Sequence, residues 1–274
     1  MKRIASIVLF LLLSVIVMQG QDVKVFAHRG CWSKNSDGTF IVPENSVPAV
    51  GEARKNGYVG IEIDVRYTKD DKMVVLHDID LNRTVRRAKD YSKLDRQVLL
   101  SDLTFEELRN EYVLESSDPA YRTPVPTLEE ILLECRRFGL VPMLHSTVLE
   151  SYEMAQELFG DGWICFADDY DKLLKVREFS DCVVLYGVYD AVTAANSPEI
   201  LAKIGGKCGI SSMTYSLYSE SFCHSFTDAG YQVQASVFPE EEEIKALKNG
   251  ITYILTDHRI HTKKEKRRLR RSAL

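Results

Sequence analysis

The sequence contains no pair of cysteines separated by two residues, although it has six cysteines in 274 residues. Structural zinc sites are usually built from such pairs, so we do not expect one here. Internal repeats are also absent, and no low-complexity stretch precedes the C-terminal end. The 45% of hydrophobic residues is typical of a globular chain. These features exclude a repeat protein and a largely disordered one.

The body of the chain lacks an excess of positive charge. The net charge is −5, but residues 2–3 contribute +2 and residues 263–274 contribute +6, which leaves −13 on the rest. An acidic body disfavours nucleic acid as a partner. We expect the basic tail at 263–274 to be solvated, with weak contact to anionic lipid as an alternative.

Long apolar runs are missing after the first twenty residues. The run Ile4–Met18 follows Lys2-Arg3 and precedes the small and polar residues Gly20 and Gln21. This pattern is typical of a secretory signal peptide, and the run is short for a transmembrane helix. We therefore predict a signal peptide at residues 1–21 and an exported protein, periplasmic or secreted. The alternative is an uncleaved membrane anchor.

An exported protein can form disulfides, but the sequence specifies no pairing of its cysteines. Cys165, Cys182 and Cys208 each lie in or beside an apolar, strand-like run. That position favours buried free thiols that act as small hydrophobic residues.

Strand-like and helix-like segments alternate along the chain. The strand-like runs are residues 23–27, 60–67, 141–144, 163–166, 182–186, 209–212, 232–236 and 253–256. Amphipathic segments that predict helices lie between them, at residues 47–56, 127–138, 170–179, 197–204, 219–229 and 240–249. Such alternation predicts a parallel sheet covered by helices. Eight repeats in about 240 residues match a (β/α)₈ TIM barrel, with an open doubly wound sheet as the alternative.

We therefore expect an α/β protein with a single barrel domain at residues 22–262. Residues 79–126 interrupt the alternation with a long, polar and turn-rich segment. A segment of that length is usually functional or a small inserted unit. Because it follows His77-Asp78, we expect it to overhang the site described next.

Polar side chains gather where the predicted strands end. Glu62 and Asp64 point to the same face of their strand because side chains repeat every second residue. Two neighbouring carboxylates repel each other unless a cation lies between them, and oxygen ligands favour Ca²⁺ or Mg²⁺. His28 and His145 also fall at strand ends, which is where barrel active sites lie. The sequence thus predicts a metal site at this end of the barrel.

Five short motifs resemble the glycerophosphodiester phosphodiesterase family. They are Ala27-His28-Arg29-Gly30, Pro43-Glu44-Asn45-Ser46, Glu62-Ile63-Asp64-Val65, Thr68 and His77-Asp78, and residues 250–257 resemble the last strand of that family. The resemblance spans residues 23–258. It implies a (β/α)₈ barrel that uses a divalent metal to hydrolyse glycerophosphodiesters to glycerol 3-phosphate and an alcohol, which makes it a phosphoric diester hydrolase.

The resemblance also implies roles for individual residues. Glu62 and Asp64 would hold the metal, His28 and His77 would be the acid–base pair, and Arg29 would bind a phosphate oxygen. Trp32 is a further candidate for contact with the substrate, with partial burial as the alternative. Glu44-Asn45 could either cap the helix that begins near residue 47 or belong to the site. Asp78 could orient His77 or close a turn.

The chain departs from the family pattern at three functional positions. His145 stands where the family has a Glu ligand, Thr147 where it has Lys, and Ser236 where it has Trp. His145 could serve as the third metal ligand, with Asp168 or Asp169 as the alternative. As a ligand, His145 would shift the expected ion from Ca²⁺ or Mg²⁺ toward Mn²⁺ or Zn²⁺. Phe238 could partly replace the missing Trp in binding the substrate.

Two other functions fit the same residues. One is a phospholipase C- or D-like enzyme that acts on intact lipid, and the other is a non-catalytic binding protein whose site has drifted. The sequence does not give the alcohol of the substrate, the oligomeric state or the identity of the metal.

Overall fold

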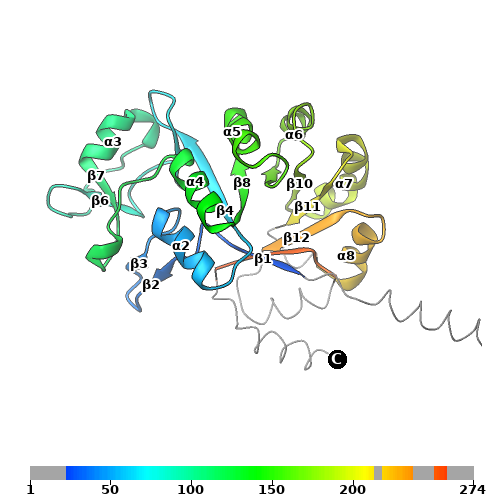
Figure 1. Ribbon diagram of the computed structural model, residues 1–274, viewed down its shortest axis with the longest axis horizontal. Coiled ribbons are helices and arrows are strands. Elements are labelled where there is room, and N and C mark those ends of the chain that lie inside the picture. Colours follow the sequence, from blue (N-terminus) through cyan, green and yellow to red (C-terminus); the bar gives the residue numbers. More distant parts are fainter. Residues whose placement is uncertain (1–22, 213–217, 237–249, 258–274) are drawn as a thin grey trace, which may run out of the picture.

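The structure is a computed structural model that describes residues 23–212, 218–236 and 250–257 (Figure 1). Its centre is a closed barrel of parallel strands. In spatial order these are β1 (Lys24–Ala27), β13 (Tyr253–Thr256), β12 (Gln232–Ser236), β11 (Cys208–Ser212), β10 (Val183–Val188), β9 (Ile164–Ala167), β8 (Val141–Ser146) and β4 (Gly60–Tyr67). β1 pairs with β13 on one side and with β4 on the other, which closes the barrel. The predicted barrel is confirmed, and the open-sheet alternative is wrong.

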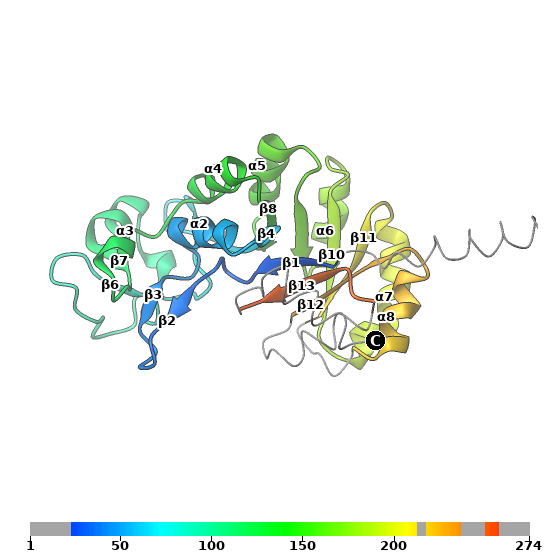
Figure 2. The ribbon, with the colours of Figure 1, turned by 60° about the horizontal axis from the view of Figure 1, so that its bottom comes forward.

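Helices form an arc along the outside of these strands, from α2 to α8, in both ribbon views (Figures 1 and 2). The helices beside the barrel strands are α2 (Val47–Lys55), α4 (Leu128–Phe138), α5 (Leu149–Phe159), α6 (Tyr170–Arg177), α7 (Ala191–Ile204) and α8 (Glu220–Thr227). Local chemistry sets several of their ends. Thr127 forms a capping box with Glu130 at the start of α4, and Gly139 ends this helix in the left-handed conformation with φ 65°.

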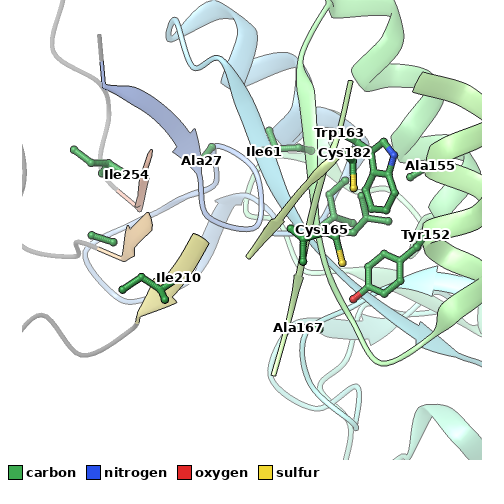
Figure 3. Close-up of a cluster of buried hydrophobic side chains, with 14 of the residues drawn as sticks. Ala27, Ile61, Tyr152, Ala155, Trp163, Cys165, Ala167, Cys182, Ile210 and Ile254 are labelled. Carbon is green, nitrogen blue, oxygen red and sulfur yellow. The ribbon is translucent and has the colours of Figure 1, made fainter. Parts of the chain in front are cut away.

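Apolar side chains fill both faces of the barrel wall. Phe26, Met143 and Phe166 belong to a buried cluster made of alternate residues of their strands. The residues between them belong to a larger cluster that the strands share with the helices. Figure 3 shows part of this larger cluster, in which Tyr152 and Trp163 lie beside Cys165. Tyr152 donates its hydroxyl hydrogen to the carbonyl groups of Ser146 (2.7 Å) and Phe166 (3.1 Å), joining the ends of β8 and β9.

The predicted insertion is a small folded unit. β5 (Met73–Val75) first extends the sheet antiparallel to β4. The unit then contains β6 (Val85–Arg87), a 3₁₀ turn at Leu100–Asp102, α3 (Phe105–Glu111), β7 (Tyr112–Leu114) and a second 3₁₀ turn at Pro119–Tyr121. It has its own buried cluster, which includes Leu81, Val85 and Leu108. These short strands gave no signal in the sequence because none exceeds three residues.

A second small hairpin lies beside this inserted unit. It consists of β2 (Ser33–Lys34) and β3 (Phe40–Val42), which pair antiparallel. The hydroxyl of Ser116 donates to the carbonyl of Ile41 at 2.6 Å, and the amide of Ser117 donates to the carbonyl of Phe40 at 2.7 Å. The β1–α2 connection and the inserted unit are thus joined at the rim of the barrel.

Several predictions concern residues outside the described ranges. These are the signal peptide at 1–21, the helix at 240–249, the basic tail at 263–274 and Phe238, and they stay predictions. All six cysteines fall within the described ranges, and each is buried. Cys165, Cys182 and Cys208 form no disulfide there, so the prediction of buried free thiols is confirmed for these three. Among the described residues, no helix has both the length and the apolar character needed to span a membrane.

Candidate active site

The register of the barrel strands brings three predicted metal ligands together. Asp64 on β4 lies directly opposite His145 on β8, and Glu62 precedes Asp64 by two residues on the same face. One ligand atom from each of the three side chains lies within 4.8 Å of the others. The Nδ1 atom of His145 is 3.9 Å from Glu62 Oε1 and 3.8 Å from Asp64 Oδ1. Both distances exceed a hydrogen bond, so His145 is not hydrogen-bonded to either carboxylate, and the three ligand atoms lie around a common point.

The charges of this cluster fit a cation. Burial and the neighbouring Asp64 carboxylate raise the pKa of Glu62 well above its usual value. Only 2% of the Glu62 side chain is exposed, so water cannot screen the repulsion. A divalent ion between the two carboxylates would remove it. The donor set of Glu62, Asp64 and His145 therefore fits a divalent metal.

His145 is held flat against an aromatic ring. Its imidazole stacks on Phe166 of β9 with a centroid separation of 4.2 Å and an angle of 15° between the planes. Desolvation lowers the pKa of His145. A lowered pKa keeps the imidazole neutral, which is the form that binds a metal.

His28, at the end of β1, is oriented by a carboxylate from the last strand's end. Its Nδ1 atom lies 2.7 Å from Oδ1 of Asp257. The indole nitrogen of Trp32 donates to the same oxygen at 3.2 Å. A carboxylate acceptor at Nδ1 favours the tautomer that carries its proton there, which leaves Nε2 as the atom suited to proton transfer.

His77, which follows β5, is oriented in the same way by a carboxylate. Its Nδ1 atom lies 2.7 Å from Oδ1 of Asp78, so the interpretation that Asp78 orients His77 agrees with the geometry. Both His28 and His77 lie close enough to His145 to affect its pKa electrostatically. The structure thus brings both predicted acid–base histidines to the predicted metal cluster.

Arg29 contacts the carboxylates of the site through both its backbone and its side chain. Its backbone has φ 57°, and its amide donates to Glu62 Oε2 at 3.0 Å. Its Nε atom is buried 3.5 Å from Asp64 Oδ2 and has no hydrogen-bond acceptor among the described residues. A buried donor in this state is suited to an oxygen of a bound anion. The next residue must be glycine, because a Cβ at Gly30 would lie 2.7 Å from the Ala49 side chain.

The structure decides between the two roles predicted for Asn45, a helix cap or a residue of the site. Ser46, not Asn45, caps α2 by accepting a hydrogen bond from the Ala49 amide. Asn45 instead donates its side-chain amide to Asp64 Oδ2 at 2.9 Å, from a backbone with φ 51°. Positive φ is uncommon for residues other than glycine and often occurs at functional sites. Asn45 therefore belongs to the site.

The sequence matches the Glycerophosphoryl diester phosphodiesterase family over residues 28–183, more than half of the chain. The chain belongs to this family. The match includes His28, Arg29, Glu62, Asp64, His77 and His145. The match ends at the first residue of β10, so β11, β12 and β13 lie outside it.

Curated members of the glycerophosphodiester phosphodiesterase family show the same likeness. Glycerophosphodiester phosphodiesterase 1 of Mus musculus is 30% identical over 164 residues, which cover 54% of this chain and 44% of the mouse protein. A glycerophosphodiester phosphodiesterase of Bacillus altitudinis is 36% identical over 110 residues, covering 40% of this chain and 38% of that protein. The matched segments thus span less than half the length of these relatives.

Solved structures support the barrel. A phosphodiesterase of Oleispira antarctica, determined in complex with the product sn-glycerol-3-phosphate, superposes with a TM-score of 0.69 at 21% identity and covers 86% of this chain and 93% of its own. A glycerophosphodiester phosphodiesterase of Parabacteroides distasonis gives a TM-score of 0.63 at 19% identity, with 93% and 99% covered. At these identities the likeness concerns the fold.

Two of the positions that depart from the family pattern, Thr147 and Ser236, differ in how far they are buried. Thr147 is exposed just beyond β8, and its carbonyl accepts a hydrogen bond from Lys172 Nζ at 2.5 Å. Ser236 is fully buried at the end of β12 and lies 3.4 Å from Gln234 Nε2. Trp32, the predicted substrate contact, is partly buried beside Asp257, while Phe238 lies outside the described ranges.

A cavity of about 200 Å³ lies between the ends of β4 and β8 and the inserted unit. Three of its lining residues, Arg66, Ile79 and Thr147, each follow a site residue by two positions in the sequence. The others are Val65, Tyr67, Leu100, Ser101 and Val148. The cavity thus borders the ends of β4 and β8 where the predicted ligands lie.

Proposed function

We propose that this chain hydrolyses glycerophosphodiesters to glycerol 3-phosphate and an alcohol, using a divalent metal and two histidines. One arrangement carries the proposal: two histidines, each oriented through Nδ1 by a carboxylate, flank the cluster of Glu62, Asp64 and His145. Membership of the glycerophosphodiester phosphodiesterase family supports the same chemistry.

Glu62, Asp64 and His145 would hold the metal. When bound, a divalent ion would neutralise the negative charge that develops on the phosphoryl oxygens. Arg29 would donate to one of these oxygens from its buried Nε. The backbone of Arg29 is fixed by its bonds to Glu62 and Asn45, so its guanidinium approaches the metal cluster from a defined position.

His28 and His77 would transfer the protons. One imidazole would take a proton from the attacking hydroxyl. If this hydroxyl belongs to water, glycerol 3-phosphate forms directly; if it belongs to the glycerol of the substrate, a cyclic phosphate forms, which water then opens to glycerol 3-phosphate. The other would protonate the leaving alkoxide, and each transfer contributes a factor of roughly 10²–10⁴ to the rate. Asp257 and Asp78 hold the two rings in the tautomer that leaves Nε2 to take part. The adjoining cavity would accept the alcohol group.

The test is a comparison of substrates with the full chain. Glycerophosphocholine, glycerophosphoethanolamine, glycerophosphoglycerol and vesicles of intact phosphatidylcholine would be incubated with metal-stripped protein, to which Ca²⁺, Mg²⁺, Mn²⁺ or Zn²⁺ is added back. We expect release of glycerol 3-phosphate from the soluble diesters. Cleavage of intact lipid alone would favour a phospholipase, and metal binding without any turnover would favour a binding protein.

A further inference from the structure

Glu44 is a buried carboxylate that the proposed chemistry does not use. Only 5% of its side chain is exposed, and it is not part of the metal cluster. Two guanidinium groups bind it instead. Arg29 donates to Oε1 at 3.1 Å, and Arg83 donates to Oε1 at 2.7 Å and to Oε2 at 2.8 Å. Burial alone would raise the pKa of Glu44, but these two arginines outweigh it and lower the pKa. Glu44 is therefore an anionic anchor for two arginines.

Arg83 binds a second carboxylate at the same time. Its Nε atom donates to Asp78 Oδ2 at 2.7 Å, and one terminal nitrogen donates to Asp78 Oδ1 at 3.1 Å. Asp78 is the residue that orients His77. Only the planar fork of arginine can serve two carboxylates in this way, because the ammonium of lysine is a single point charge. One guanidinium thus links His77, through Asp78, to Glu44.

The backbone that carries Arg83 belongs to the inserted unit. Leu81 and Val85, two residues to either side, are both fully buried in the core of that unit. The amide of Val85 donates to the carbonyl of Leu81 at 3.0 Å, which closes a turn around Arg83. The core of the inserted unit therefore fixes where the guanidinium lies.

We propose that Arg83 is a positioning residue that fixes His77 and Arg29 relative to each other through Asp78 and Glu44. The proposal rests on the proposed function and adds a role for the inserted unit, which completes the site by supplying this guanidinium. Arg83 touches neither the metal cluster nor a reacting atom, so it acts through the two side chains that it holds in place.

The test compares Arg83→Met with a matched control, Arg87→Met. Arg87 belongs to the same unit, but its ion pair with Asp95 lies at the surface. We expect Arg83→Met to lower kcat for glycerophosphodiester hydrolysis about 10- to 100-fold. Mn²⁺ affinity should stay within about twofold of wild type, and Arg87→Met should match wild type. Arg83→Lys should have the melting temperature of wild type but the low kcat of Arg83→Met. Guanidinium added to the solution should partly restore the kcat of Arg83→Ala.

A second readout does not depend on turnover. In metal-free protein labelled with ¹⁵N in its imidazoles, His77 should show the Nδ1-protonated tautomer in wild type and Arg87→Met, and a mixture of tautomers in Arg83→Met. An unchanged His77 spectrum in Arg83→Met would overturn the proposal even if wild type proved inactive on these diesters. If wild type is active and Arg83→Met or Arg83→Lys has the same kcat, the positioning role is overturned as well. An inactive wild type with the expected spectra would reject the proposed function and leave the positioning role standing.

Discussion

His28 and Asp257 come from opposite ends of the barrel sequence and meet at 2.7 Å. They meet because the first strand pairs with the last, with Ala27 opposite Thr256. Closure of the barrel therefore creates the orientation of the histidine that the proposed mechanism needs. No local pattern in the first thirty residues specifies this contact.

This contact predicts the effect of replacing Asp257. Asp257→Asn keeps the size of the side chain but removes the charge that selects the Nδ1-protonated tautomer of His28. We expect kcat to fall about 10- to 100-fold with little change in KM. Asp190→Asn is the matched control, because Asp190 caps α7 at the surface and asparagine caps a helix equally well. Equal kinetics for the two variants would contradict the assigned role of Asp257.

The metal cluster predicts opposite effects of one substitution on metal-free and metal-loaded protein. Glu62→Gln replaces a buried carboxyl group whose pKa is raised by burial and by Asp64. Without metal, the variant should therefore melt at the same temperature as wild type or higher. Wild type should gain about 2.7 kcal/mol of stability at a free metal concentration of 100 times Kd, and Glu62→Gln should gain almost none. Thermal melting with and without Mn²⁺ measures both effects.

The control for that experiment is Glu153→Gln, which changes an exposed carboxylate on α5. It should respond to metal as wild type does. A metal response that survives in Glu62→Gln would place the ion elsewhere.

His145 predicts the choice of metal. Imidazole favours Mn²⁺ or Zn²⁺ more than a carboxylate does, while Ca²⁺ and Mg²⁺ prefer oxygen ligands. His145→Glu should therefore raise the affinity for Ca²⁺ relative to that for Zn²⁺. Isothermal titration of both ions into metal-stripped wild type and variant gives this ratio. A ratio that is the same in both proteins would mean that His145 is not a ligand.

Asp78 predicts a pH dependence of stability. Partial burial opposes its ionisation, but hydrogen bonds from Arg83 and His77 outweigh burial and lower its pKa to about 2. Because this pKa is lower in the folded state, the ionised carboxylate stabilises the fold at pH values above the unfolded pKa of about 4. This stabilisation is lost as the pH falls toward 2. Wild type should therefore melt above Asp78→Asn at pH 6, and the gap should close as the pH falls from 4 to 2. A gap that is independent of pH would show that the Asp78 charge does not stabilise the fold.

Most of the repeating elements could be predicted because they follow from local periodicity. The strands at 60–67, 232–236 and 253–256 begin and end where the apolar runs do. Two helices are exceptions. No helix was predicted for α5, and the amphipathic pattern predicted a helix at 197–204, whereas α7 begins at Ala191, capped by Asp190, and carries Pro198 in its interior. The Asp190 cap and the packing of Ala194 and Leu201 against the barrel outweigh the hydrogen bond that proline cannot make.

The contacts within the site that could not be predicted join residues distant in sequence. The sequence left open whether Asn45 caps a helix or belongs to the site, and its partner Asp64 lies nineteen residues away. Arg83 lies 39 residues from Glu44, in a segment without clear periodicity. A sequence motif predicts that a side chain lies at the end of a strand. Which other strand ends lie beside it is known only from the closed barrel. The inserted unit adds a further layer that no motif describes.

We propose that metal bound by Glu62, Asp64 and His145 acts together with His28 to hydrolyse the phosphodiester. Both requirements can be measured by following glycerophosphocholine by ³¹P NMR with the metal-stripped full chain, before and after Mn²⁺ is added, for wild type and His28→Ala. We expect the glycerol 3-phosphate signal to appear only with metal, and its rate of appearance to be at least 100-fold lower in His28→Ala. Product formed without metal, or at an equal rate in His28→Ala, would show that this mechanism is wrong.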